Sequence, residues 1–109
     1  MNLAPVPFTV LDWRSAEVTE HAGEHGNALW QTLKHGDIRT RIVTYSPGYL
    51  ADHWCRKGHI IFVLEGSFVS ELENGESHRI AQGQGYVVGD EVMPHRSFTE
   101  DGVKLLIVD

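Results

Sequence analysis

Short runs of alternating or β-branched residues, separated by glycine and proline, fill most of the chain after residue 27. Such runs predict strands, because successive side chains of a strand point to opposite faces of a sheet. Turn-forming pairs such as Asn74-Gly75 and Asp101-Gly102 separate neighbouring runs. The strands expected there cover residues 28–35, 38–45, 50–55, 59–65, 67–72, 76–81, 86–88, 95–99 and 103–108, with a tight turn between residues 65 and 67.

The first 27 residues are less regular. Residues 1–8 hold two prolines and predict an extended N-terminal arm, and residues 8–13 alternate well enough for a short strand. Residues 14–27 are polar, show little apolar periodicity and predict a loop. With 109 residues, no internal repeat and no linker, the chain is expected to form a single domain. Many short strands without a convincing long helix favour an all-β sandwich or small barrel.

Candidate metal ligands gather in the middle of the chain. If residues 50–55 form a strand, His53 and Cys55 point to the same face. His59 then opens the next strand across a turn, so a hairpin would bring three donors to one surface. His95 is a fourth candidate. Imidazole and thiolate together suit a first-row transition metal better than calcium or magnesium.

Charge and cysteine content exclude several classes of protein. The formal net charge is −6 with histidines neutral, which argues against a nucleic-acid partner. A single cysteine cannot form an internal disulfide, so no oxidising compartment is implied. The chain starts without a signal-peptide pattern, and no window reaches the roughly 18 apolar residues of a membrane span. A cytoplasmic protein without a membrane partner is expected.

Two motifs carry a family resemblance. Residues 48–66, GYLADHWCRKGHIIFVLEG, resemble the first cupin motif, in which a glycine precedes two histidines two apart, a glutamate and a glycine. Residues 85–95, GYVVGDEVMPH, resemble the second motif, and ADHWC is similar to the small single-domain cupins named for a DHCW motif. The resemblance implies an all-β double-stranded β-helix, the cupin jelly-roll barrel, over residues 1–109, with a metal inside.

The resemblance also implies a ligand set. His53 and His95 match the motif histidines, whereas Cys55 replaces the second histidine and His59 replaces the glutamate. Three histidines and one cysteine favour zinc as the single divalent metal, with iron, nickel and copper as alternatives. Four bound ligands would close a tetrahedral structural site, whereas three histidines without Cys55 would leave positions open for catalysis.

Strand parity and the resemblance suggest what surrounds that site. Arg41 is a candidate anchor for a carboxylate-bearing ligand, and the full set of pocket candidates is Arg41, Tyr45, Ile61, Phe68 and Ser97. Similar small cupins often pair as homodimers, so the resemblance implies a homodimer, and residues 8–13 are the strand expected to pack or exchange across its interface.

Three functions remain open from the sequence. The first is a metal-dependent oxygenase, isomerase or hydrolase acting on a small organic substrate. The second is a non-catalytic metal or small-molecule binding or sensor protein with a closed site of three histidines and one cysteine. The third is a barrel whose histidines bind nothing. Since no nucleophile triad, phosphate-binding glycine loop or paired acid–base carboxylates can be read from the chain, an enzymatic function depends on the metal alone.

Overall fold

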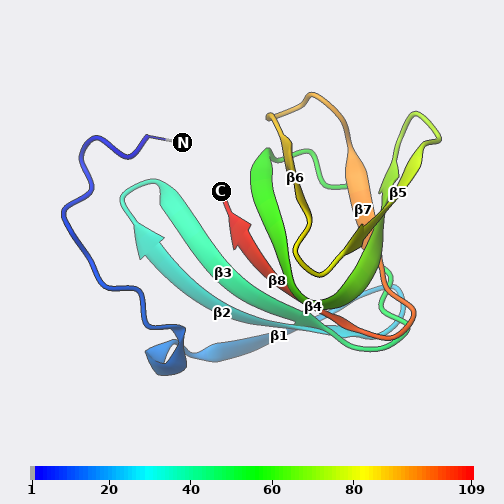
Figure 1. Cartoon of the computed structure of the whole chain (residues 1–109), viewed down its shortest axis with the longest axis horizontal. Coiled ribbons are helices and arrows are strands. Elements are labelled where there is room, and N and C mark those ends of the chain that lie inside the picture. The colour runs from blue at the N-terminus through cyan, green and yellow to red at the C-terminus, as the bar shows by residue number, and fades with distance from the viewer. Residues whose placement is uncertain (1) are drawn as a thin grey trace.

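The computed structural model describes residues 2–109 and consists almost entirely of antiparallel strands (Figure 1). A short 3-10 helix, η1 (Trp13–Ser15), precedes them, and the Asp12 side chain caps it by accepting a hydrogen bond from the Arg14 N–H. No helix among residues 2–109 is long and apolar enough to cross a membrane. The strands are β1 (Val18–Ala22), β2 (Asn27–His35), β3 (Ile38–Tyr45), β4 (His59–Leu72), β5 (Ser77–Ala81), β6 (Gly85–Val88), β7 (His95–Phe98) and β8 (Val103–Val108).

The long strand β4 belongs to two sheets and joins them into a jelly-roll barrel. Its first half lies between β8 and β6, in the sheet that continues through β3 and β2 to β1. Its second half lies between β5 and β7. Figure 1 shows β4 bending sharply from one sheet to the other. The structure therefore has the all-β cupin architecture that the sequence predicted.

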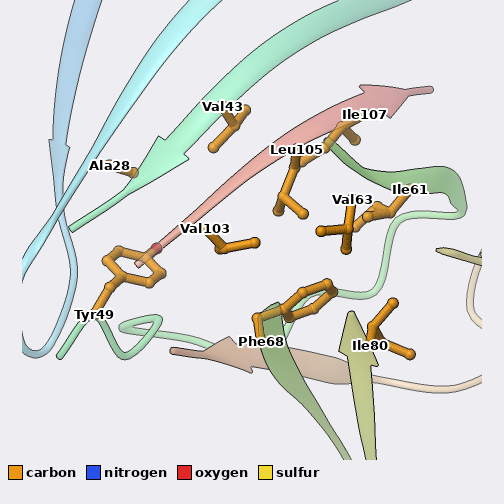
Figure 2. Close-up of a cluster of buried hydrophobic side chains, with 10 residues drawn as sticks. All are labelled: Ala28, Val43, Tyr49, Ile61, Val63, Phe68, Ile80, Val103, Leu105 and Ile107. Atoms are coloured by element: carbon orange, nitrogen blue, oxygen red, sulfur yellow. The ribbon is translucent and has the colours of Figure 1, made fainter. Parts of the chain in front are cut away.

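The core fills the space between the two sheets (Figure 2). Along the start of β4, buried and exposed residues alternate, with His59, Ile61 and Val63 inside. Along β8 the odd-numbered residues are buried and the even-numbered ones are half-buried, as expected of a strand between two neighbours. The inward positions of the first sheet thus form the inner wall of the barrel.

The predicted tight turn between residues 65 and 67 is wrong. The chain continues as one strand, and its pairing with β8 shifts register between Val63 and Glu65. This irregularity, followed by Gly66 at φ 81°, bends the strand instead of reversing it. Glycine between two apolar runs was interpreted as a hairpin because a bulge and a turn have similar sequences.

Two N-terminal predictions also need correction. Residues 8–13 do not form a strand, and the chain enters η1 instead. The predicted loop at residues 14–27 contains β1, which pairs with β2 over five residue positions. This edge strand is mostly exposed, so its sequence lacks the apolar alternation that reveals a half-buried strand. Within the predicted arm, residues 2–8 contain a turn closed by the Val6 N–H on the Leu3 carbonyl, and Met1 lies outside the described residues.

The bend at Gly66 predicts a stability difference between two glycine substitutions. A Cβ at Gly66 would lie 2.5 Å from the Gly102 carbonyl oxygen, whereas a Cβ at Gly75 meets nothing within 4 Å. Both glycines have positive φ. Gly75→Ala should therefore destabilise by about 1 kcal/mol, and Gly66→Ala by about 3 kcal/mol or more because overpacking adds to the backbone strain. Urea denaturation of both variants measures the difference, and equal losses would contradict this account of the bend.

Candidate metal centre

Three of the four candidate ligands converge inside the barrel. One ligand atom each from Cys55, His59 and His95 lies within 4.8 Å of the others. His59 begins β4 and His95 begins β7, and both are buried. Cys55 is half-buried and is held against His95 by two backbone hydrogen bonds of 2.7 and 3.0 Å. Two strands and one anchored loop residue therefore form the centre.

His53 does not join this group. Residues 50–55 are not a strand, because their ladder contacts are isolated bridges at Leu50 and Cys55. The His53 side chain is 75% exposed, and its Nδ1 lies 2.6 Å from Asp52 Oδ1. It lines the cavity from the solvent side. The parity argument for His53 failed because side chains alternate regularly only on a regular strand.

The two buried imidazoles are turned toward each other. His95 Nδ1 lies 2.8 Å from the Met93 carbonyl oxygen, so this nitrogen carries the proton. His59 Nδ1 faces Asp109 Oδ2 at 3.7 Å and has no hydrogen-bond partner. The two Nε2 atoms are 2.8 Å apart. At this distance a proton or a cation must lie between the two nitrogen atoms.

This donor set fits a transition metal. Tetrahedral zinc, with bonds of about 2.0–2.1 Å, places its nitrogen ligands about 3.3 Å apart. The observed separation of 2.8 Å between the two Nε2 atoms is that of a hydrogen bond, so the two rings would move apart by about 0.5 Å to admit the ion. A metal-bound Nε2 on His59 would leave the proton on Nδ1, where the Asp109 carboxylate faces it. Such a carboxylate orients a metal-binding histidine.

The surroundings of His59 and Cys55 also favour the protonation states in which these side chains bind metals. Burial lowers the pKa of His59, although the neighbouring Asp109 carboxylate raises it. The net lowering favours the neutral imidazole. Interaction with His95 lowers the pKa of the Cys55 thiol toward the thiolate that binds metals. Although burial disfavours the charged form of His95, Cys55 and the Met93 carbonyl raise the pKa of this histidine. Cys55 and His95 thus each favour the charged form of the other.

A cavity of about 180 Å³ adjoins the three ligands. Four of the five predicted pocket residues line it, namely Arg41, Tyr45, Ile61 and Ser97. Phe68 instead packs in the hydrophobic core. Sequence reasoning missed Tyr86, whose hydroxyl lies 3.2 Å from His59 Nε2. Burial raises the pKa of Tyr86, so this residue presents a neutral hydroxyl to the centre.

Sequence reasoning also missed Asp109, whose side chain is only 1% exposed. Its carboxylate accepts hydrogen bonds from Arg39 at 2.9 and 3.2 Å and from Arg41 at 3.0 Å. Although burial disfavours its charge, hydrogen bonds and the two guanidinium groups hold the pKa of Asp109 well below its usual range. Strand alternation could have revealed this residue, because Asp109 follows Val103, Leu105 and Ile107 at the next inward position.

These features define a cupin barrel with a candidate metal centre, and comparisons with solved structures support the fold. The chain is 18% identical to the polyketide cyclase RemF from Streptomyces resistomycificus, over 94% of this chain and 78% of that one, with a TM-score of 0.75. It is 16% identical to an RmlC-like cupin from Shewanella frigidimarina, over 94% and 90% of the two chains, with a TM-score of 0.73.

A third similar structure is that of Fe(II)-HppE, with 14% identity and a TM-score of 0.74. The match covers 94% of this chain but only 60% of that one. No protein-family model and no curated protein matches the chain. The narrower resemblance to DHCW-motif cupins therefore stays a prediction.

The buried carboxylate predicts a large and pH-dependent stability effect. Asp109→Asn should lower the free energy of unfolding by about 3 kcal/mol, because it leaves the buried Arg41 guanidinium without its counter-charge. Since the pKa of Asp109 is lower in the folded state, its contribution is present above the ordinary value of 3.8 and is lost as the pH falls through the folded-state pKa. Urea denaturation at pH 7 and at lower pH measures both effects.

A matched control comes from an exposed ion pair. Asp12 pairs with Arg14 at 2.9 Å, and the Arg14 side chain is 91% exposed. Asp12→Asn keeps an amide oxygen that can still cap η1, so it should change the stability by less than about 1 kcal/mol. A loss at Asp109 no larger than that at Asp12 would contradict the assigned role of the buried carboxylate.

Proposed function

We propose that the protein binds one divalent transition metal through Cys55, His59 and His95 and uses it to act on a small organic molecule. The observation that carries the proposal is the convergence of these donors beside a cavity. Both histidines present Nε2 to the centre, and their outer nitrogens face an acceptor. Orientation of this kind is typical of metal-binding histidines.

The number of ligands supports an open site. Catalytic zinc sites use three protein ligands and keep a fourth position for water or substrate, whereas structural sites use four. The exposure of His53 supports the three-ligand arrangement. A closed site with His53 as the fourth ligand is the alternative, and it would favour a binding or sensor role.

The residues around the centre have separate roles in this proposal. Asp109 orients His59, and the Met93 carbonyl orients His95. The Tyr86 hydroxyl and Ser97, which both line the cavity, are placed to hydrogen-bond a ligand there. When bound, the metal would supply a Lewis acid that polarises a carbonyl or acidifies a water molecule.

Donor chemistry favours zinc for this centre. Zinc has no redox chemistry, so hydrolysis and isomerisation are the reactions that it would support. The similar Fe(II)-HppE structure supports iron as the second candidate, and with iron an oxygenase would be the expected activity. Metal identity therefore separates the reaction classes.

The ligand assignment predicts how metal content responds to substitution. Protein purified without a chelator should contain close to one equivalent of metal, measured by mass spectrometry. His59→Ala and His95→Ala should lose it almost completely, because each removes a buried strand ligand. His78→Ala is the control, since His78 is exposed and contacts Glu76 instead of the centre. Full metal occupancy in His59→Ala would contradict the assignment of His59 as a ligand.

Spectroscopy tests whether Cys55 and His53 bind the metal. In protein loaded with cobalt(II), Cys55→Ser should abolish the thiolate charge-transfer band, whereas His53→Ala should leave the ligand-field spectrum unchanged. A changed spectrum in His53→Ala would support the closed four-ligand site. Absence of any stoichiometric metal from the wild-type protein would favour a barrel whose histidines bind none.

We also propose that the protein forms a homodimer through the outer face of its first sheet. Val87 is 76% exposed and pairs with Ile60 across β4 and β6. Phe62 is also exposed, and its β8 partner Leu106 is half-buried. A continuous apolar face of this kind favours association. In the N-terminal arm Phe8 is 97% exposed, so this arm is a second candidate for the interface.

Association can be measured directly. Sedimentation velocity should give a dimer for the wild-type protein and a monomer for Phe62→Glu, because a charge at the centre of the apolar face opposes burial. Phe8→Glu tests the arm separately, and Glu76→Gln in an exposed turn is the neutral control. A wild-type monomer at all concentrations would contradict the proposal.

A further inference from the structure

The lining of the cavity beside the metal centre has more positive than negative side chains, although the chain is acidic. Four side chains with a fixed positive charge line it, and Asp109 is the one carboxylate among its lining residues. The whole chain carries a formal charge of −6. Low-dielectric walls strengthen such a local charge and attract a ligand of opposite sign. The four cationic residues are Arg39, Arg41, Lys57 and Arg96.

The available carboxylates do not balance these charges. Arg96 pairs with Glu71 at 3.1 Å outside the cavity lining. Arg39 and Arg41 share the single carboxylate of Asp109. Lys57 is exposed at the rim and has no ion pair among residues 2–109. One guanidinium charge therefore lacks a counter-ion in the buried part of the cavity.

Arg41 is the cation whose donors are least satisfied. Its side chain is 7% exposed, and its Nη2 donates to Asp109 Oδ2 at 3.0 Å. Its Nε is buried and has no hydrogen-bond partner. The Trp30 ring lies 4.4 Å from the guanidinium carbon and covers one of its faces. Nη1 has no acceptor among residues 2–109 and is not enclosed by protein, so it is the nitrogen open to the cavity.

This site lies close to the metal centre. Asp109 Oδ2 contacts Arg41 at 3.0 Å and faces His59 Nδ1 at 3.7 Å. The guanidinium and the outer nitrogen of a metal ligand therefore flank the same oxygen atom. Arg41 and the three candidate ligands line the same cavity, so a molecule held by Arg41 would share that space with the centre.

We propose that Arg41 is the recognition site for the carboxylate of a small organic acid, which is the ligand class of the metal centre in the function proposed above. The open Nη1 of this guanidinium can donate a charge-assisted hydrogen bond to a carboxylate. Lys57 at the rim adds attraction on entry. The cavity of about 180 Å³ is smaller than the roughly 300–1,000 Å³ of pockets for drug-sized ligands, so the acid is small.

Matched pairs of acids and amides test this proposal without knowledge of the natural substrate. Lactate is compared with lactamide, and salicylate with salicylamide, by ligand-observed NMR titration of zinc-loaded and metal-free protein. Each acid should bind wild-type protein at least about tenfold more tightly than its amide, because only the acid forms a charged hydrogen bond with Arg41. Arg41→Gln should bring this ratio close to one.

Two further variants keep the result interpretable. The double variant with Arg41→Gln and Asp109→Asn removes one positive and one negative charge together. It provides a folded protein to test if Arg41→Gln alone unfolds. Arg79→Gln is the control, because Arg79 contacts Ser67 outside the cavity and should leave the ratio unchanged.

The outcomes separate this proposal from that of the metal centre. An acid preference that depends on Arg41 in metal-free protein supports the recognition site even if no metal binds. A preference that survives both Arg41 variants, or that occurs only with zinc bound, would assign the carboxylate to another cation or to the metal. Equal binding of acid and amide, or no acid binding at millimolar concentration, would overturn the proposal.

Discussion

The buried carboxylate of Asp109 is the contact that ties the centre to the barrel. It accepts hydrogen bonds from Arg39 and Arg41 on β3 and faces His59 at the start of β4. The backbones of Arg39 and Asp109 also exchange two hydrogen bonds, which extend the pairing of β3 and β8 beyond the end of β8. Because an unpaired charge at this depth is costly, the three strands have one favourable arrangement. The same contact that stabilises the barrel therefore orients a candidate metal ligand.

Strand curvature brings the other histidine to the same place. His95 on β7 pairs with Leu72, the last residue of β4, while His59 is the first residue of that strand. The two rings meet because β4 bends between its ends (Figure 1). The irregular pairing near Glu65 and the positive φ of Gly66 produce that bend. Backbone geometry far from the centre thus sets the distance between two ligands.

The sequence predicted regular strands well and irregular segments poorly. Residues 38–45 and 103–108 form strands with the predicted bounds, because β-branched and apolar residues dominate both. Strand β1 was missed because exposure removes the apolar pattern. Cys55 reaches the centre from a loop that was expected to be a strand, and His53 does not. Asp109 was overlooked because a carboxylate after an apolar run is usually interpreted as the solvated end of a strand.

The loop that carries Cys55 and His53 decides how many ligands the centre can have. Backbone hydrogen bonds hold Ala51 to Ser97 and Cys55 to His95, whereas within residues 2–109 none holds the three residues between them. His53 is restrained mainly by an exposed contact with Asp52, and such contacts contribute little to stability. Movement of His53 toward the cavity would therefore cost little, whereas His59 and His95 are fixed by strands. The two strand histidines would therefore define the position of the proposed metal, and the loop would determine whether Cys55 alone or His53 as well could reach it.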